Sequence, residues 1–320
     1  MNIAYKRPAP SVTLVLVCYN QEKYIKEAVF SALNQDYTPL KIIISDDCSS
    51  DKTVSIIEET LKSHSSKHEV IVNRNLTNQG LIQHINIVNK LVDTELLVIA
   101  AGDDISHQNR VSKTIEAYRL AEQQPTSIYS SVRCISDNDE LGDIWSPPIR
   151  ETGHSILNCA LKGGLIIGAS HAWHKSLFTT FGDITEKGAY EDLVLAYRSA
   201  ILGGLVYIDE PLVYYRHGVG ISHIKKENVP KKIANRNKLA YVNKHMIPVL
   251  KQRLIDSEHI SNKTVKIQTQ KIIAKEINKF QIIDAFLERH KIIKIYRLAK
   301  KHANLIFFAR YLRKRIFNKI

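Results

Sequence analysis

The chain has 320 residues, of which 44% are hydrophobic and 24% are charged. A chain of this length and composition buries one large core or two modest ones, so intrinsic disorder is excluded. Its cysteines show no Cys-x-x-Cys spacing, which argues against a zinc site or a disulfide framework and favours a reducing, cytoplasmic compartment; they are Cys18, Cys48, Cys134 and Cys159.

No window approaches the roughly 18 consecutive apolar residues of a membrane-spanning helix, and residues 1–10 hold no apolar stretch of signal-peptide length. The formal net charge is +13, but it is unevenly distributed. Residues 1–224 carry 20 Lys and Arg against 26 Asp and Glu, whereas residues 225–320 carry 25 against 6. This asymmetry predicts an anionic partner for the last third alone. We therefore expect a cytoplasmic protein that can lie peripherally on the inner face of the cell membrane.

The first 125 residues repeat a strand followed by a helix four times. Such a repeat is typical of a parallel, helix-covered sheet of the Rossmann-like α/β class. Asn20 is the predicted cap of the first helix and Asp51 that of the second. The predicted strands are residues 11–20, 40–44, 70–72 and the apolar run that begins at residue 96, and the predicted helices include 21–35, 81–91 and 108–123.

The fourth strand is the most informative, because the run LLVIAAGDDIS delivers Asp103 and Asp104 side by side. Open α/β sheets bind ligands at the carboxyl ends of their strands. Two adjacent carboxylates repel each other unless a cation joins them, and Mg²⁺ or Mn²⁺ is usually held by one or two carboxylates with phosphate oxygens and waters. The alternative is that the pair begins a helix, since Asp is a good N-cap.

Acidic residues also end the second strand, at Asp46 and Asp47. The first turn, CYNQEK, contains no G-x-G-x-x-G, so a glycine-loop dinucleotide site is not supported. Carboxylates accept hydrogen bonds from ribose hydroxyls and base N–H groups. The strand ends therefore predict a site for a nucleotide bound without a glycine loop.

The second half is less regular. A strand at 126–135 is followed by a turn in DNDELG, a proline-containing loop, a helix that opens at Glu191 and Asp192, and a strand within 205–216. From about residue 228 the chain predicts long helices rich in Lys, Ile and Leu, with a break at 257–261 and helices at about 265–289 and 291–315. The last of these is either an amphipathic helix at a membrane surface or a helix that packs on protein.

Five stretches between residues 11 and 222, taken in order, resemble the family 2 glycosyltransferases of the GT-A type: CYNQEKYIKEAVFSALNQ, SDDCSSDKT, NRNLTNQG, GDD and YEDLVLAYR. These enzymes transfer a sugar from a nucleotide-sugar donor with inversion at the anomeric carbon. The resemblance implies a GT-A Rossmann-like, mostly parallel sheet flanked by helices in residues 1–224. Its nucleotide-sugar half spans about 11–135 and its acceptor half about 136–224, and a basic helical extension follows at 225–320.

The same resemblance implies roles for individual residues. Asp46 contacts the nucleobase, with Asp47 as the alternative, Asp103 contacts the ribose, and Asp104 holds a Mg²⁺ or Mn²⁺ ion that bridges the two phosphates. Asp192 is the catalytic base, with Glu191 as the less favoured candidate. Further donor-site residues are Cys18, Asn20, Arg74, Asn75 and Gly80, His217 is a candidate for the metal or diphosphate, and Trp173 and His171 are candidates for the acceptor.

The implied reaction moves a sugar, most simply from a UDP-sugar, to a hydroxyl of a glycan or lipid-linked acceptor in surface polysaccharide synthesis, such as that of capsule or lipopolysaccharide. Ala101 stands where many relatives have a further Asp, so a strict D-x-D motif is absent. No Q-x-x-R-W motif is present either, which favours a non-processive enzyme. The alternative function is a nucleic-acid-binding protein that uses the basic C-terminal tail, but no recognised nucleic-acid motif supports it.

Overall fold

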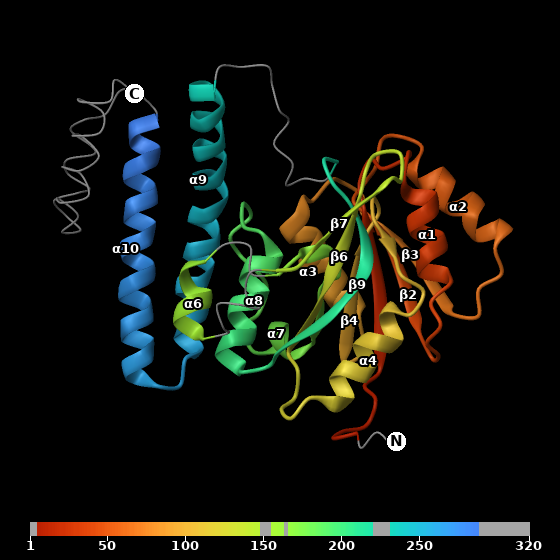
Figure 1. The fold of residues 1–320 in the computed structure, drawn as a ribbon, viewed down its shortest axis with the longest axis horizontal. Coiled ribbons are helices and arrows are strands. Elements are labelled where there is room, and N and C mark those ends of the chain that lie inside the picture. The colour runs from red at the N-terminus through yellow and green to blue at the C-terminus, as the bar shows by residue number, and fades with distance from the viewer. Residues whose placement is uncertain (1–4, 148–154, 163–165, 220–230, 288–320) are drawn as a thin grey trace.

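The computed structural model describes residues 5–147, 155–162, 166–219 and 231–287 (Figure 1). Its centre is a mixed sheet with the strand order β3-β2-β1-β4-β8-β6-β9-β5, and β7 pairs with β6. The strands are β1 (Val12–Cys18), β2 (Lys41–Asp46), β3 (Glu69–Arg74), β4 (Leu96–Ala101), β5 (Ile105–Ser106), β6 (Ser127–Ile135), β7 (Leu141–Trp145), β8 (Ala172–His174) and β9 (Leu205–Arg216).

Helices cover both faces of this sheet. Those on the first three-fifths of the chain are α1 (Ile25–Leu33), α2 (Thr53–Ser63), α3 (Leu81–Leu91), α4 (Arg110–Leu120), α6 (Ile156–Leu161), α7 (Ser176–Thr179) and the 3₁₀ turn η1 (Gly168–Ser170). They are followed by α8 (Glu191–Leu202), α9 (Lys231–Asp256), the 3₁₀ turn η2 (Ser257–His259) and α10 (Lys263–Leu287). The described part of the chain holds no helix long and apolar enough to cross a bilayer.

The strands β3, β2, β1 and β4 are parallel, as the repeated strand–helix pattern predicts. Alternate residues of each strand face opposite helical layers, because side chains in a strand alternate between the two sides of the sheet. Leu14 and Ile42 pack with α1, α2 and α4, whereas Val15 and Ile43 pack with α3 and α8. Burial on both faces explains why β1, β2 and β4 read as continuous apolar runs in the sequence, whereas the edge strand β3 is mostly exposed.

Three local predictions about helix starts are wrong. Asn20 does not cap α1, which begins at Ile25; Asn20 adopts φ +51° and its Oδ1 accepts a hydrogen bond from Ser50 N at 2.8 Å. Asp51 lies one residue before the cap of α2 and accepts a hydrogen bond from Thr53 N at 2.9 Å. The alternative in which Asp103 and Asp104 cap a helix also fails, because α4 starts only at Arg110.

The basic extension begins as part of the main core. Figure 1 shows α9 and α10 as two long helices side by side, with α6 and α8 between them and the sheet. Val249 and Ile273 are fully buried in the same hydrophobic cluster as Val15 of β1 and Tyr197 of α8. The predicted break at 257–261 coincides with η2, whereas the predicted helix at 291–315 lies outside the described residues.

A buried ion pair ties α9 to α8. Arg198 Nε donates to Asp256 Oδ2 at 2.8 Å and Arg198 Nη2 to Asp256 Oδ1 at 3.1 Å, and both side chains are at most 1% exposed. Removing one partner of such a pair leaves a buried charge without its counter-ion. The stability of residues 1–224 therefore depends on this contact with α9.

We expect Asp256→Ala to lower the free energy of unfolding by about 3–5 kcal/mol, measured by urea denaturation. The matched control is Glu210→Ala, which removes an exposed pair with Lys113 at 2.9 Å and is expected to cost less than about 1 kcal/mol. Equal, small losses in the two variants would contradict the importance of the α8–α9 pair.

Candidate active site

The carboxyl ends of β1, β2 and β4 meet at one edge of the sheet. Cys18 lies opposite Asp46, and Ala101 lies opposite Val17, so Asp46 and the Gly-Asp-Asp stretch are adjacent in space. The Asp46 side chain is 1% exposed, and its Oδ2 accepts a hydrogen bond from Ser49 N at 2.8 Å. The edge therefore gathers the acidic residues that the sequence places at separate strand ends.

Asp47 organises the loop before α3. One carboxylate oxygen accepts from Asn75 Nδ2 at 2.8 Å and from Gln79 N at 2.9 Å, and the other accepts from Gly80 N at 2.9 Å. Gly80 has φ +74°, a conformation that favours glycine at this turn into the helix. These hydrogen bonds bring Asp47 together with Asn75 and Gly80 and fix the loop between β3 and α3.

The remaining donor-site candidates differ in exposure. Arg74 is exposed at the end of β3, whereas Cys18 is buried and its Sγ donates to Ser45 O at 3.5 Å. Asn20 supports the loop after β2 through Ser50. Tyr19, which lies between Cys18 and Asn20 in the chain, is 44% exposed. This aromatic residue directly follows β1 but is not among the predicted site residues.

Close packing fixes Asp103 and Asp104. A Cβ atom on Gly102 would lie 2.8 Å from Cys18 Cβ and 3.0 Å from Ile25 Cδ1, so only glycine lets the chain pass so near β1. Asp103 and Asp104 are 8% and 6% exposed. Burial raises the pKa of both carboxyls, and for Asp104 the neighbouring Asp103 charge raises the pKa further.

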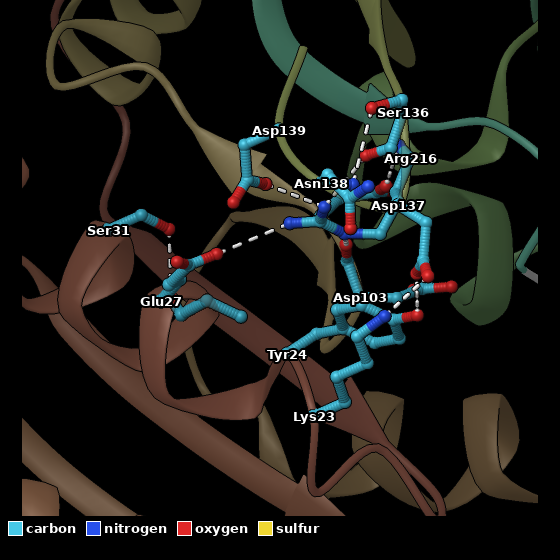
Figure 2. Close-up of polar contacts among 12 residues, drawn as sticks. Lys23, Tyr24, Glu27, Ser31, Asp103, Ser136, Asp137, Asn138, Asp139 and Arg216 are labelled. Carbon is cyan, nitrogen blue, oxygen red and sulfur yellow. Dashed lines mark hydrogen bonds and ion pairs between the residues drawn. The ribbon is translucent and has the colours of Figure 1, made fainter.

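Arg216 holds this acidic pair from the end of β9. Its backbone N donates to Asp104 Oδ1 at 2.8 Å, and its Nε donates to the carbonyl oxygen of Asp103 at 3.0 Å. Its guanidinium is buried and also donates from Nη1 to Ser136 O at 2.9 Å (Figure 2). One side chain thus links the Gly-Asp-Asp stretch to the turn between β6 and β7.

The same guanidinium reaches the N-terminal part of the chain. It forms ion pairs with Asp139 at 2.6 Å and with Glu27 at 3.2 Å, and it lies 4.6 Å from the centre of the Tyr24 ring. Lys23 and Tyr24 both contact Asp137 in the same turn (Figure 2). Arg216 is not among the predicted site residues, because no local pattern in the sequence signals contacts between residues so far apart in the chain.

A second pair of carboxylates stands at the first turn of α8. Glu191 and Asp192 are half-buried against η1, where a Cβ on Gly168 would lie 3.0 Å from Glu191 Oε1 and 3.6 Å from Asp192 Cβ. Asp192 Oδ1 accepts a hydrogen bond from Leu193 N at 2.7 Å, whereas Glu191 Oε2 is buried and makes no hydrogen bond within the described structure. Burial raises the pKa of Asp192 to about 6 and, together with the Asp192 charge, raises that of Glu191 to about 8.

The sheet brings the two acidic pairs to the same region. Strand β8 runs antiparallel to β4, with Ile99 N donating to His171 O at 3.1 Å, so the preceding turn η1 lies near the carboxyl end of β4. The buried Arg110 guanidinium, which lies close enough to Asp104 to be attracted by it, donates to Ala169 O of η1 at 2.8 Å. The turn η1 therefore connects the first turn of α8, which carries Glu191 and Asp192, to the end of β4 that precedes Asp103 and Asp104.

Trp173 and His171 lie elsewhere. Both side chains are fully buried; Trp173 Nε1 donates to Asn89 Oδ1 at 3.0 Å, and His171 Nε2 is 2.8 Å from Ser127 Oγ. Burial lowers the pKa of His171 to about 3, so its ring is neutral. Neither ring presents a face to a substrate, so the predicted acceptor role of Trp173 and His171 is wrong.

The donor atoms at this edge suit a hard divalent cation, since carboxylate oxygen is the ligand that Mg²⁺ and Mn²⁺ prefer. Within the described ranges no group of three or more His, Cys, Asp or Glu side chains is arranged to hold an ion. Asp103 and Asp104 supply such oxygens, and an ion held by them would need further ligands such as phosphate oxygens and water. His217 is exposed next to Arg216, and its backbone N donates to Ile135 O at 3.0 Å.

Residues 13–171 match the family described as Glycosyl transferase family 2. The chain belongs to this family. Membership of this family supports a glycosyltransferase rather than a nucleic-acid-binding protein.

A glycosyltransferase of Haemophilus influenzae is 28% identical over 279 residues, which cover 80% of this chain and 84% of that protein. Staphylococcus aureus TarS 1–349, solved in complex with UDP, superposes with a TM-score of 0.59 at 16% identity and covers 89% of this chain and 76% of its own. The mannosyltransferase PcManGT of Pyrobaculum calidifontis, solved with GDP-Man and Mn²⁺, superposes with a TM-score of 0.53 at 14% identity. This superposition covers 100% of this chain and 92% of PcManGT. The predicted fold class is confirmed.

The tight packing at Gly102 gives a test of this geometry. We expect Gly102→Ala to lower the free energy of unfolding by about 1–3 kcal/mol, because the added methyl group overpacks the contact with Cys18 and Ile25. Gly142→Ala on β7 is the control, since its Cβ would meet only Cys134, at 3.3 Å from the carbonyl oxygen. Chemical denaturation of both variants measures the difference, and equal stability would count against the packing at the Gly-Asp-Asp stretch.

Proposed function

We propose that this family 2 glycosyltransferase moves a sugar from a UDP-sugar to a hydroxyl of a glycan or lipid-linked acceptor, in a metal-dependent reaction that inverts the anomeric carbon. The observation that carries the proposal is the convergence of two acidic pairs on one sheet edge, Asp103–Asp104 from β4 and Glu191–Asp192 from α8. One pair serves the leaving diphosphate and the other serves the incoming hydroxyl.

On the donor side, Asp46 or Asp47 contacts the base, Arg74 and Asn75 contact the base or ribose, and Asp103 contacts the ribose. The Tyr19 ring, which is exposed directly after β1, adds a stacking surface for the base. The UDP bound to TarS supports a uracil nucleotide, and the GDP-Man and Mn²⁺ bound to PcManGT support the diphosphate-sugar and the metal. When bound at Asp104, Mg²⁺ or Mn²⁺ offsets the negative charge that grows on the leaving nucleoside diphosphate.

On the acceptor side, Asp192 is the base. As the acceptor oxygen forms its bond to the anomeric carbon, its proton passes to the Asp192 carboxylate and the bond to the diphosphate breaks. A base whose pKa is raised to about 6 is mostly ionised at neutral pH and still takes up a proton readily. Glu191, whose pKa is raised to about 8, stays mostly protonated beside it, so the two groups avoid mutual repulsion.

The basic extension supports a place at an anionic membrane surface, where lipid-linked acceptors for surface polysaccharides are found. Lys263, Lys271 and Lys275 are exposed along α10. Each basic residue near an anionic bilayer contributes about 1 kcal/mol of attraction. Since no Q-x-x-R-W motif is present, the enzyme adds one or a few sugars rather than a long polymer.

The chemistry is tested with two isosteric variants. Asp192→Asn is expected to lower kcat by about 10²- to 10⁴-fold while UDP-sugar binding, followed by thermal shift with Mn²⁺, persists, because the variant lacks only the base. Asp104→Asn is expected to weaken that Mn²⁺-dependent binding itself. Asp183→Asn, which alters an exposed carboxylate paired with Lys90, is the matched control and should behave as wild type.

Two further readouts belong to the same experiment. For the wild type, kcat/KM should rise with pH through about 6 and then level off, because the base must lose its proton to act. NMR of the first product should show inverted anomeric configuration. Turnover that survives EDTA and is undiminished in Asp104→Asn and Asp192→Asn, or a retained configuration, would contradict the proposed mechanism.

Membrane association is tested by co-sedimentation with vesicles of phosphatidylglycerol and phosphatidylcholine. Replacing Lys263, Lys271 and Lys275 by Gln should lower the partition coefficient at least about tenfold, since three surface charges are lost. A matched triple change of Lys62, Lys67 and Lys175 to Gln, all exposed outside the extension, should have little effect. Equal losses in the two triple variants, or equal binding to pure phosphatidylcholine, would overturn the electrostatic role of α10.

A further inference from the structure

We propose that Trp145, with Tyr215 beside it, forms a platform on which a pyranose ring of the acceptor glycan stacks. The inference rests on the proposed function, because it names the subsite that presents the hydroxyl to Asp192. It replaces the buried Trp173 as the aromatic contact for the acceptor.

Trp145 is a large aromatic residue in an exposed position. It ends β7, a strand that pairs on one side with β6, and it is 47% exposed, whereas the second tryptophan of the chain, Trp173, is fully buried. The ring centres of Trp145 and Tyr215 lie 6.2 Å apart and their planes meet at 56°. Two rings at this angle form an open corner instead of a closed stack.

Register and packing connect this corner to the segment that precedes η1. Trp145 lies directly opposite Val132 of β6. Val132 packs with Ile167 and Val213 in a small buried cluster, and Tyr215 packs against the same cluster. The platform therefore rests on the segment that leads into η1.

That segment leads to the proposed base. Gly168 follows Ile167 directly, and a Cβ on Gly168 would lie 3.0 Å from Glu191 Oε1 and 3.7 Å from Asp192 Oδ2. On the other side, the residue after Tyr215 is Arg216, whose backbone N binds Asp104. The cluster beneath the aromatic corner is thus adjacent in the chain to residues that contact each of the two acidic pairs.

The surroundings suit a sugar. Asp143, two residues before Trp145 and therefore on the same face of β7, is exposed. A pyranose has an apolar C–H face that suits an aromatic ring and a rim of hydroxyls that suits a charged neighbour.

The two tryptophans make the site measurable in the full-length protein. Acrylamide quenches an exposed indole and spares a buried one, so quenching reports mainly on Trp145. With UDP and Mn²⁺ present, we titrate methyl α- and β-hexopyranosides and the corresponding disaccharides. At least one is expected to protect Trp145 saturably, and Trp145→Phe, which keeps an aromatic face, should remove the signal but keep the binding seen by ligand-observed NMR.

Trp145→Ala is expected to raise the dissociation constant of the protecting glycoside about tenfold in the same NMR experiment, the loss typical of one aromatic stacking contact. Ile144→Ala, which changes the neighbouring half-exposed residue on the opposite face of β7, is the matched control and should bind as wild type. An equal loss in both variants would mean that the strand itself was disturbed, and would overturn the platform.

The remaining outcomes separate this inference from the proposed function. If UDP raises the unfolding temperature with Mn²⁺ but no glycoside protects Trp145, the platform is refuted and the donor site stands. If neither UDP nor any glycoside binds, both are refuted. Undiminished glycoside affinity in Trp145→Ala would also overturn the platform, whatever the donor does.

Discussion

The site depends on keeping two adjacent carboxylates buried at a sheet edge. Asp103 and Asp104 are both less than 10% exposed, and like charges so close raise each other's energy in a medium of low dielectric constant. Two buried guanidinium groups, those of Arg216 and Arg110, attract Asp104. The backbone N of Arg216 also binds the Asp104 carboxylate, and its Nε binds the Asp103 carbonyl oxygen. These contacts leave little positive charge for a diphosphate, which is why the proposed mechanism includes a divalent cation.

The parallel part of the fold could be read from the sequence because its signals are local. Strands β1, β2 and β4 are buried on both faces and read as apolar runs, and α3 matches its predicted range, 81–91. Asp46 and Asp103 meet at one edge as a direct consequence of parallel pairing. The start of α1 was misjudged because Asn20 has a good capping side chain, which binds Ser50 from another loop instead.

The contacts that complete the site could not be read in this way. Arg216 meets Asp103 and Asp104 across more than 100 residues, and β8 joins β4 in an antiparallel pair that no repeat announces. Trp173 of β8 and His171, which directly precedes that strand, look like site residues in the sequence, yet both are fully buried. Local chemistry identifies residue types that suit a ligand, but exposure is decided by the tertiary pairing of strands.

Burial also changes how the basic charge of the C-terminal third is interpreted. Arg253 contributes to the basic total, but its side chain is fully buried, where burial lowers its pKa to about 10, and it donates to Leu193 O at 2.8 Å and to Lys162 O at 3.0 Å. Leu193 follows Asp192 directly. Together with the Arg198–Asp256 pair, Arg253 fixes the first turns of α8, so α9 sets the position of Glu191 and Asp192. The helices that present lysines to the surroundings therefore also support this pair of carboxylates.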